Sequence, residues 1–493
     1  MLRSVLLSVV SGILIAIALP GYGVFPAAFV ALVPLFFALE NAPLKKSLTL
    51  AFLAGLTTGL IYYIWSIKSS LHYSESISGK SVLVYIGLSV YHAIWFTFIG
   101  DAYYATRRKF NKEPLKFILS FASLSVCVEW AYQNILPSYP WIIILPYTQS
   151  NNLLLLQWTS LGGMWLLTFI VAGFNAVIFF ALKEKRKNVV FVGTGTLIGF
   201  HIIGYVLFVN VQHSSGSTVN VAILQENIDA NSRWDNTFVD SLAHTFLTLN
   251  GQAAEKNPQL IIWSETAIPW TFRTDDDLLN EALRITYKTK ATHLVGMLTP
   301  VDNAGNVYNS LYCIEKDGKV TGRYDKQNLL SFLEKPFVRW QLPLEQSRYS
   351  NVQEGTRNNI LQTQFASIGA MICNESLSPY ASAKAAVQNA QLLVVASNDS
   401  WFYGSVLVDA HLSLSRMRAV ETRKDIAINA NRGYGGFIRA SGELEIQQPS
   451  VYARVISGEV YLNSATTFAA QFPDIMLYCA LIFFSITLIH KKP

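Results

Sequence analysis

The chain has 493 residues, of which 51% are apolar and only 14% are charged. Soluble domains carry roughly 25% charged residues, so the composition excludes a wholly water-soluble protein. The formal net charge is +6, but much of the lysine and arginine stands in short clusters beside apolar runs. This pattern is typical of membrane topology, and we expect no nucleic-acid partner.

Long apolar segments fill the chain up to about residue 210. A membrane-spanning helix needs about 20 mainly apolar residues, and most of these segments approach that length. We predict a membrane domain of seven spans over 1–210, and an eighth span with a short tail over 471–493. The eight segments are 4–19, 24–39, 48–67, 82–105, 117–136, 153–182, 189–209 and 475–489.

The loops between these segments differ in charge. Basic clusters follow the even-numbered segments at 45–46, 107–116 and 183–187, whereas the loops after odd-numbered segments are poor in lysine and arginine. The positive-inside rule therefore predicts that both termini are cytoplasmic and that region 211–470 lies outside. In a bacterium with two membranes, that outside compartment is the periplasm.

Region 211–470 contains short strand-like runs separated by helical stretches, which predicts an α/β layered domain. The runs are 219–225, 260–263, 293–298, 308–314, 365–373, 392–397 and 453–462, and an Asp317-Gly318 turn suggests a further hairpin. The helical stretches are 236–256, 275–291, 379–390 and 409–424.

Three reactive side chains stand at or just beyond predicted strands. Glu265 follows LIIW, Lys326 follows the hairpin, and Cys373 ends SIGAMIC. Taken singly they have ordinary alternatives: a turn carboxylate, a solvated lysine and a buried hydrophobic thiol. Taken together they are chemically coherent, because a carboxylate can accept a thiol proton while an ammonium stabilises an oxyanion.

Four motifs add a resemblance to a known family. LIIWSETAIP, YDKQNLL and MICNES, followed by ASNDSWF at 396–402, resemble the Glu-Lys-Cys signature of the nitrilase superfamily. Eight membrane segments with the α/β domain inserted before the last resemble its membrane branch, the apolipoprotein N-acyltransferases of the bacterial inner membrane. The resemblance covers essentially the whole chain and implies an αββα sandwich outside the cytoplasm.

The resemblance also implies roles for individual residues. It implies that Glu265 is the general base, Lys326 the oxyanion stabiliser and Cys373 the nucleophile. It implies supporting or substrate-binding roles for Trp234, Glu334, Asn374 and Glu375, although Trp234 could equally be a packing aromatic. Asn398, Asp399 and Trp401 would shape the site rather than react. No metal and no cofactor is expected.

The activity that the resemblance implies is the last step of lipoprotein maturation. A phospholipid would acylate Cys373, and the thioester would then acylate the N-terminal S-diacylglyceryl-cysteine of a lipoprotein, with ping-pong kinetics. Two alternatives stay open. One is a membrane-tethered nitrilase-type amidase acting on a small amide, and the other is a non-enzymatic transporter or scaffold.

Two further features have a structural and a functional interpretation. Glu129 is a carboxylate within the fifth apolar segment, where charge is costly and marks a functional candidate. We favour the alternative that it is a buried hydrogen-bonding partner for another helix. Arg416, Arg418 and Glu421 share a predicted helix, and we interpret them as structural ion pairing.

Overall fold

The computed structural model describes residues 2–67, 69, 79–135, 143–185, 187–212, 216–229, 239–330, 334–335, 351–356 and 358–489. The chain forms two compact units. The first comprises Met1–Asn210, Ser405–Ser413 and Phe472–Pro493, and the second comprises Val211–Gly404 and Leu414–Gln471.

The first unit is helical. Its main helices are α1 (Leu2–Ala18), α2 (Val33–Leu39), α3 (Leu44–Tyr62), α5 (Gly79–Lys109), α6 (Pro114–Asn134), α8 (Thr159–Glu184), α9 (Lys187–Gln212) and α15 (Ile475–Ile489). In the described parts of the chain, five helical stretches are long and apolar enough to cross a membrane: Leu44–Ile67, Ser81–Lys109, Pro114–Asn134, Thr159–Glu184 and Phe191–Val211. Three shorter apolar stretches coincide with the remaining predicted segments, so eight spans stay a prediction.

The second apolar segment is not one continuous helix. It consists of a 3₁₀ turn, η1 (Phe25–Phe29), and the short helix α2, each with a proline in its first turn. Asn175 of α8 satisfies the backbone at this break: its amide donates to the Ala28 carbonyl and its oxygen accepts from the Leu32 N–H, both at 2.8 Å. Because a bilayer offers no water to free backbone groups, this side chain makes the interruption tolerable.

Glu129 of α6 is buried and fully engaged. Its carboxylate accepts from the Leu145 N–H at 2.7 Å and from the Thr168 hydroxyl of α8 at 2.6 Å. The interpretation of Glu129 as a hydrogen-bonding partner for another helix is therefore confirmed.

The second unit contains two β-sheets. The first has the order β13-β1-β2-β4-β5-β6, with β3 paired to β4, and the second has the order β12-β11-β10-β9-β8-β7. Strands β1, β2 and β4 are parallel, as are β8, β9 and β10. The bounds are β1 Thr218–Gln225, β2 Leu260–Ile262, β3 Ile268–Thr271, β4 Thr292–Pro300, β5 Val307–Ile314, β6 Val320–Asp325, β7 Ile360–Gln362, β8 Ser367–Ile372, β9 Leu392–Asn398, β10 Ile426–Asn431, β11 Gly435–Ile438, β12 Leu444–Gln447 and β13 Arg454–Tyr461.

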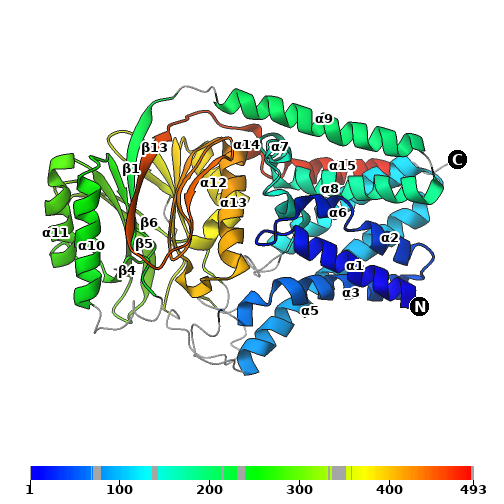
Figure 1. Cartoon of the computed structure of the whole chain (residues 1–493), viewed down its shortest axis with the longest axis horizontal. Helices are drawn as coiled ribbons and strands as arrows, with labels where there is room; N and C mark the ends of the chain where they lie inside the picture. Colours follow the sequence, from blue (N-terminus) through cyan, green and yellow to red (C-terminus); the bar gives the residue numbers. More distant parts are fainter. Residues whose placement is uncertain are drawn as a thin grey trace. The chain divides into compact units, whose positions relative to one another are not determined.

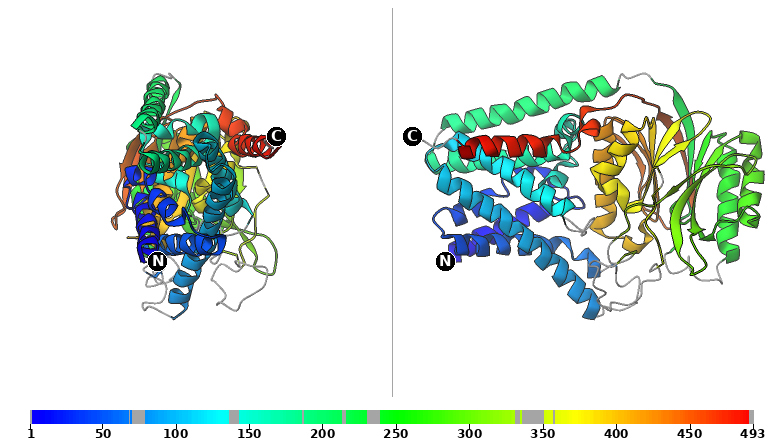
Figure 2. Two further views of the ribbon diagram at one scale, coloured as in Figure 1. Left: turned by 90° about the vertical axis from the view of Figure 1, so that its right-hand side faces the viewer. Right: turned by 180° about the vertical axis from the view of Figure 1, so that it is seen from behind.

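Helices cover both outer faces of the sheet pair. Helices α10 (Val239–Ala254) and α11 (Asp277–Thr286) pack on the first sheet, where Phe246 stacks on Trp263 with ring centroids 4.6 Å apart. Helices α12 (Pro379–Val387) and α13 (Val406–Thr422) lie on the side of the second sheet (Figure 1; Figure 2, right). The layer order is helix, sheet, sheet, helix, and the predicted α/β layered domain is confirmed.

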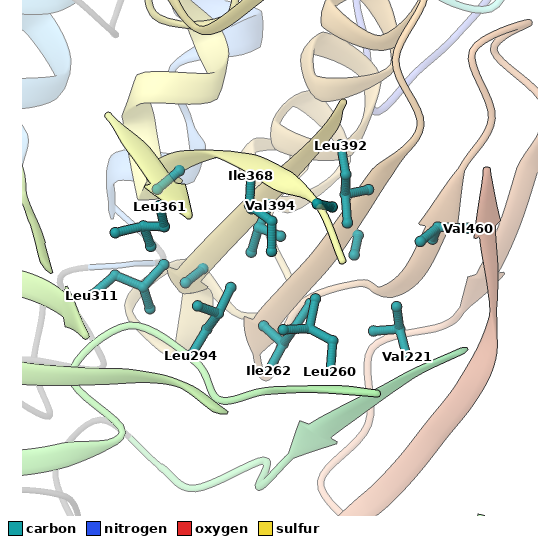
Figure 3. Close-up of a cluster of buried hydrophobic side chains, with 14 of the residues drawn as sticks. Val221, Leu260, Ile262, Leu294, Leu311, Leu361, Ile368, Leu392, Val394 and Val460 are labelled. Atoms are coloured by element: carbon teal, nitrogen blue, oxygen red, sulfur yellow. The ribbon is translucent and has the colours of Figure 1, made fainter. Parts of the chain in front are cut away.

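The main core of this domain lies between the two sheets. Aliphatic side chains from both sheets interdigitate there (Figure 3), including Leu260, Ile262, Leu294, Ile368 and Val394, all fully buried. Burial of such side chains stabilises by about 1.5–3 kcal/mol each, so this core fixes the position of one sheet against the other. The site described below depends on that position.

Candidate active site

The three predicted reactive residues come from both sheets. Glu265 lies three residues beyond β2 and Lys326 directly follows β6, so both belong to the first sheet. Cys373 directly follows β8 of the second sheet. Electrostatic interaction links the Cys373 thiol to both other side chains, so the fold brings the trio together.

Lys326 lies between two carboxylates. Its Nζ is 3.1 Å from Oε1 of Glu265 and 2.9 Å from Oε2 of Glu334, and its side chain is 1% exposed. Burial opposes the charged form, but attraction by the two carboxylates prevails and holds the pKa of Lys326 well above its usual value. Lys326 is therefore a buried cation paired with both Glu265 and Glu334.

Glu265 is held from three directions. Besides Lys326, its Oε1 accepts from the Asn309 side-chain amide at 2.8 Å, and its Oε2 accepts from the backbone N–H of Asn398 at 2.9 Å. The turn that presents it contains Thr266 at a φ of +49° and passes close over Gly296 of β4. These contacts fix the position of the Glu265 carboxylate.

Cys373 adopts a left-handed backbone conformation directly after the end of β8. Its φ is +53°, and it begins a 3₁₀ turn over Cys373–Leu377. Burial raises the pKa of the thiol most, and repulsion by Glu265 adds to this, whereas Lys326 and a hydrogen bond with Ser397 act in the opposite direction. The net pKa lies well above the usual value, so the resting sulfur is protonated and needs a proton acceptor before it can attack.

Glu375 connects the two sheets beneath the site. Its fully buried carboxylate accepts from the Tyr324 hydroxyl at 2.7 Å, the Gln327 N–H at 2.8 Å and the Asn328 N–H at 3.1 Å. The other oxygen accepts from the Ile372 N–H at 2.8 Å. Burial raises the pKa of Glu375, while these donors favour its charged form. Glu375 thus ties the residue before Cys373 to the residues on both sides of Lys326.

The remaining predicted residues have different placements. Asn374, in the 3₁₀ turn after β8, donates from its side-chain amide to the Asn328 carbonyl at 2.9 Å, so its side chain contacts the loop that follows Lys326. Trp234 lies outside the described residues. Of the predicted ion-paired helix, Arg418 and Glu421 of α13 form a buried ion pair at 3.1 Å, while Arg416 donates to the Gly442 carbonyl.

Sequence reasoning did not identify Asn309 or Tyr324 as site residues. Both lie inside strands, β5 and β6, and their side chains touch Glu265 and Glu375 respectively. A polar residue within a buried strand is the one available signal, because it needs a hydrogen-bonding partner there.

Two family models match the chain, in an order that parallels its two units. The model described as apolipoprotein N-acyltransferase N-terminal domain matches residues 11–177, and the carbon-nitrogen hydrolase model matches residues 220–457. The second match contains Glu265, Lys326 and Cys373.

Curated relatives match over nearly the full chain. An apolipoprotein N-acyltransferase of Geobacter metallireducens is 28% identical, covering 97% of this chain and 93% of its own. One of Chlorobaculum tepidum is 24% identical over 96% of this chain and 94% of its own. Among solved structures, a carbon-nitrogen hydrolase from Helicobacter pylori aligns with 56% of this chain and 99% of its own, at 15% identity and a TM-score of 0.38.

Proposed function

Because the chain belongs to the apolipoprotein N-acyltransferase family, a membrane branch of the nitrilase superfamily, and is an acyltransferase, we propose that it N-acylates lipoproteins through a thioester on Cys373. The acyl donor is a membrane phospholipid. The acceptor is the α-amino group of an N-terminal S-diacylglyceryl-cysteine. No cofactor takes part.

The first half-reaction forms the acyl-enzyme. Glu265 takes the proton of the Cys373 thiol as the sulfur attacks the ester carbonyl of the phospholipid. The carbonyl oxygen becomes an oxyanion, which the ammonium of Lys326 stabilises. When the intermediate collapses, the C–O bond of the ester breaks, and the leaving alkoxide takes the proton from Glu265. The products are a thioester and a lysophospholipid.

The second half-reaction transfers the acyl chain. The amine of the acceptor attacks the thioester carbonyl, and the same oxyanion position is used again. Glu265 accepts the proton that the nitrogen loses as the amide forms, the C–S bond breaks, and the proton returns to the sulfur of Cys373. An ester and an amine have become an alcohol and an amide, and the enzyme is restored.

The observation that carries this proposal is the buried Lys326 between the carboxylates of Glu265 and Glu334, together with the electrostatic interaction of Lys326 and Glu265 with the Cys373 thiol. Glu265 is held by hydrogen bonds from Asn309 and Asn398 and interacts electrostatically with the Cys373 thiol, which supports its role as general base. Glu334 offsets the charge of Lys326 without approaching the sulfur in any described contact.

We further propose that the protein lies in the bacterial inner membrane as a multi-pass protein with eight spans. Both termini are cytoplasmic and the catalytic domain is periplasmic, as the basic clusters after even-numbered segments support. Both substrates are lipid-anchored, which gives a physical reason for a site attached to membrane helices. Single cysteines introduced into the loops and labelled from outside the cell would test this arrangement.

Intact mass spectrometry tests the chemistry. Purified full-length protein is incubated with a phospholipid that carries two different, known acyl chains. We expect a mass gain of one acyl chain that hydroxylamine removes, and its loss when a synthetic diacylglyceryl-cysteine peptide is added.

Two cysteine variants make this test specific. Cys373→Ala should form no adduct, whereas Cys313→Ala, at a buried cysteine of β5 outside the site, should form the wild-type adduct. An adduct on Cys373→Ala would contradict the proposal. Hydrolysis of a soluble amide by wild-type protein without any adduct from lipid would favour the amidase instead.

A further inference from the structure

Asn431 ends β10, and its side chain is fully buried. Its amide nitrogen donates to the Ile228 carbonyl at 2.8 Å, and its oxygen accepts from the Ile228 N–H at 2.8 Å. The side chain thus pairs with both backbone groups of Ile228, as a neighbouring strand would. The second hydrogen of the amide is donated to Oδ1 of Asn398, also at 2.8 Å.

Asn398 extends this contact to the active site. It ends β9 and is the direct neighbour of Asn431 in the parallel pair of β9 and β10. Its side-chain oxygen accepts from Asn431 and from the Ser400 hydroxyl, which fixes the conformation of the residue. Its backbone N–H donates to Oε2 of Glu265 at 2.9 Å. Two hydrogen-bonded contacts, one to the side chain and one from the backbone of Asn398, therefore connect Asn431 to the carboxylate of Glu265.

Asn429, two residues earlier on β10, provides a comparison, because it is a buried amide with structural contacts only among those described. It is equally buried, and it donates to the backbone carbonyls of Leu224 at 2.9 Å and Ile262 at 3.1 Å. These bonds join the two sheets, but in the described contacts Asn429 touches no donor to Glu265. Asn431 differs because one of its partners holds the catalytic carboxylate.

We propose that Asn431 is a positioning residue for Glu265, which it orients through Asn398. This inference rests on the proposed role of Glu265 as general base. The N–H of Asn398 stabilises the charged carboxylate only when it points at Oε2, and Asn431 keeps it there. If that alignment is lost, the charged form of Glu265 is stabilised less relative to its protonated form. The acid limb of the pH–rate profile therefore moves to higher pH.

The test measures the rate of acyl-enzyme formation against pH, by intact mass, in full-length detergent-purified protein. Three variants and a control are compared: Asn431→Ala, Asn398→Ala, the double variant and Asn359→Ala. Asn359 is 2% exposed and donates to the Ala381 carbonyl, so its loss removes a buried amide elsewhere in the same domain.

We expect each single site variant to slow acylation about tenfold at neutral pH and to move the acid limb upward by about half a pH unit. Because the two residues act in series, the double variant should be no slower than the slower single one. Asn359→Ala should lose thermal stability but keep the wild-type limb.

An unmoved limb in Asn398→Ala, or losses that add in the double variant, would overturn the inference. If Asn431→Ala does not fold, Asn431→Ser replaces it, and an unmoved limb in that variant has the same meaning. Wild-type protein that forms no adduct would overturn the proposed function, and this inference with it. A wild-type adduct with unmoved variants overturns the inference alone.

Discussion

We expect a single added methyl group at Gly296 to reduce activity far more than it reduces stability. In β4 it lies directly under the turn that carries Glu265, where a Cβ would overlap the Ser264 carbonyl oxygen and lie 2.6 Å from the Thr266 nitrogen. An unstrained contact of this kind needs about 3.4 Å, so the turn must move by at least about 1 Å in Gly296→Ala. Overpacking of this kind costs about 1–3 kcal/mol in stability.

The catalytic effect should be larger than the loss of stability alone implies. A displacement near 1 Å of a reacting group can cost about 100-fold in rate, and Glu265 moves with the turn. We therefore expect acyl-enzyme formation by folded Gly296→Ala to fall about 100-fold. The assay is the time course of the hydroxylamine-labile mass gain, read together with thermal unfolding of the same preparation.

Gly458→Ala is the matched control. A Cβ at Gly458 of β13 would lie 2.5 Å from the ring of Phe437 in the core, so it also overpacks the domain, but against a side chain and not against the Glu265 turn. It should lose similar stability and keep its acylation rate. If Gly296→Ala acylates as fast as Gly458→Ala at equal stability, the turn is not what positions the base.

Three further predictions use other contacts. Glu375→Gln keeps the shape of the side chain, but its NH₂ group must then face either the Ile372 N–H or the donors on the other oxygen, such as the Tyr324 hydroxyl. We expect the free energy of unfolding, measured by chemical denaturation, to fall by about 3 kcal/mol and acylation to slow. A variant with wild-type stability and activity would contradict this. Glu265→Gln should slow acylation by at least about 100-fold, because the Cys373 thiol loses its proposed proton acceptor. The time course of the intact-mass gain measures this, and acylation at the wild-type rate would contradict the assigned role. Glu129→Leu leaves the Leu145 N–H without its acceptor. The free energy of unfolding, measured by thermal denaturation, should fall by about 1–3 kcal/mol, while the folded fraction acylates at the wild-type rate. Lost acylation in stably folded protein would assign Glu129 a functional role.

Glu265 and Cys373 could be proposed as site residues from the sequence because each stands at or near the end of an apolar run, whereas Lys326 is indicated by the hairpin before it and by the family resemblance. Such a run marks a buried strand, and the polar residue beyond it marks the sheet edge. The residues that hold the trio could not be predicted in this way. Asn398 reaches Glu265 across 133 positions of the chain, and Asn309 reaches it across 44. No local pattern encodes such a pairing.

The same limit explains what the prediction missed in the fold. Strand β10 reads IAINAN, and its two asparagines resemble turn residues, although both are fully buried and bonded across the domain. The interruption of the second apolar segment was missed for a related reason. It depends on Asn175, which hydrogen-bonds to Leu32 across 143 positions. Buried amides whose hydrogen-bond partners are distant in the sequence are therefore the features that the sequence pattern does not predict.

The division of the trio between two sheets has a consequence for biogenesis. Cys373 belongs to one sheet, and Glu265 and Lys326 belong to the other, so under the proposed roles neither sheet alone would carry the reaction. A chain whose two sheets have not packed together would hold Cys373 apart from Glu265 and Lys326. On the proposed mechanism, packing of the core between the sheets is therefore the folding step that creates activity, and a copy with an unformed core would form no acyl-enzyme.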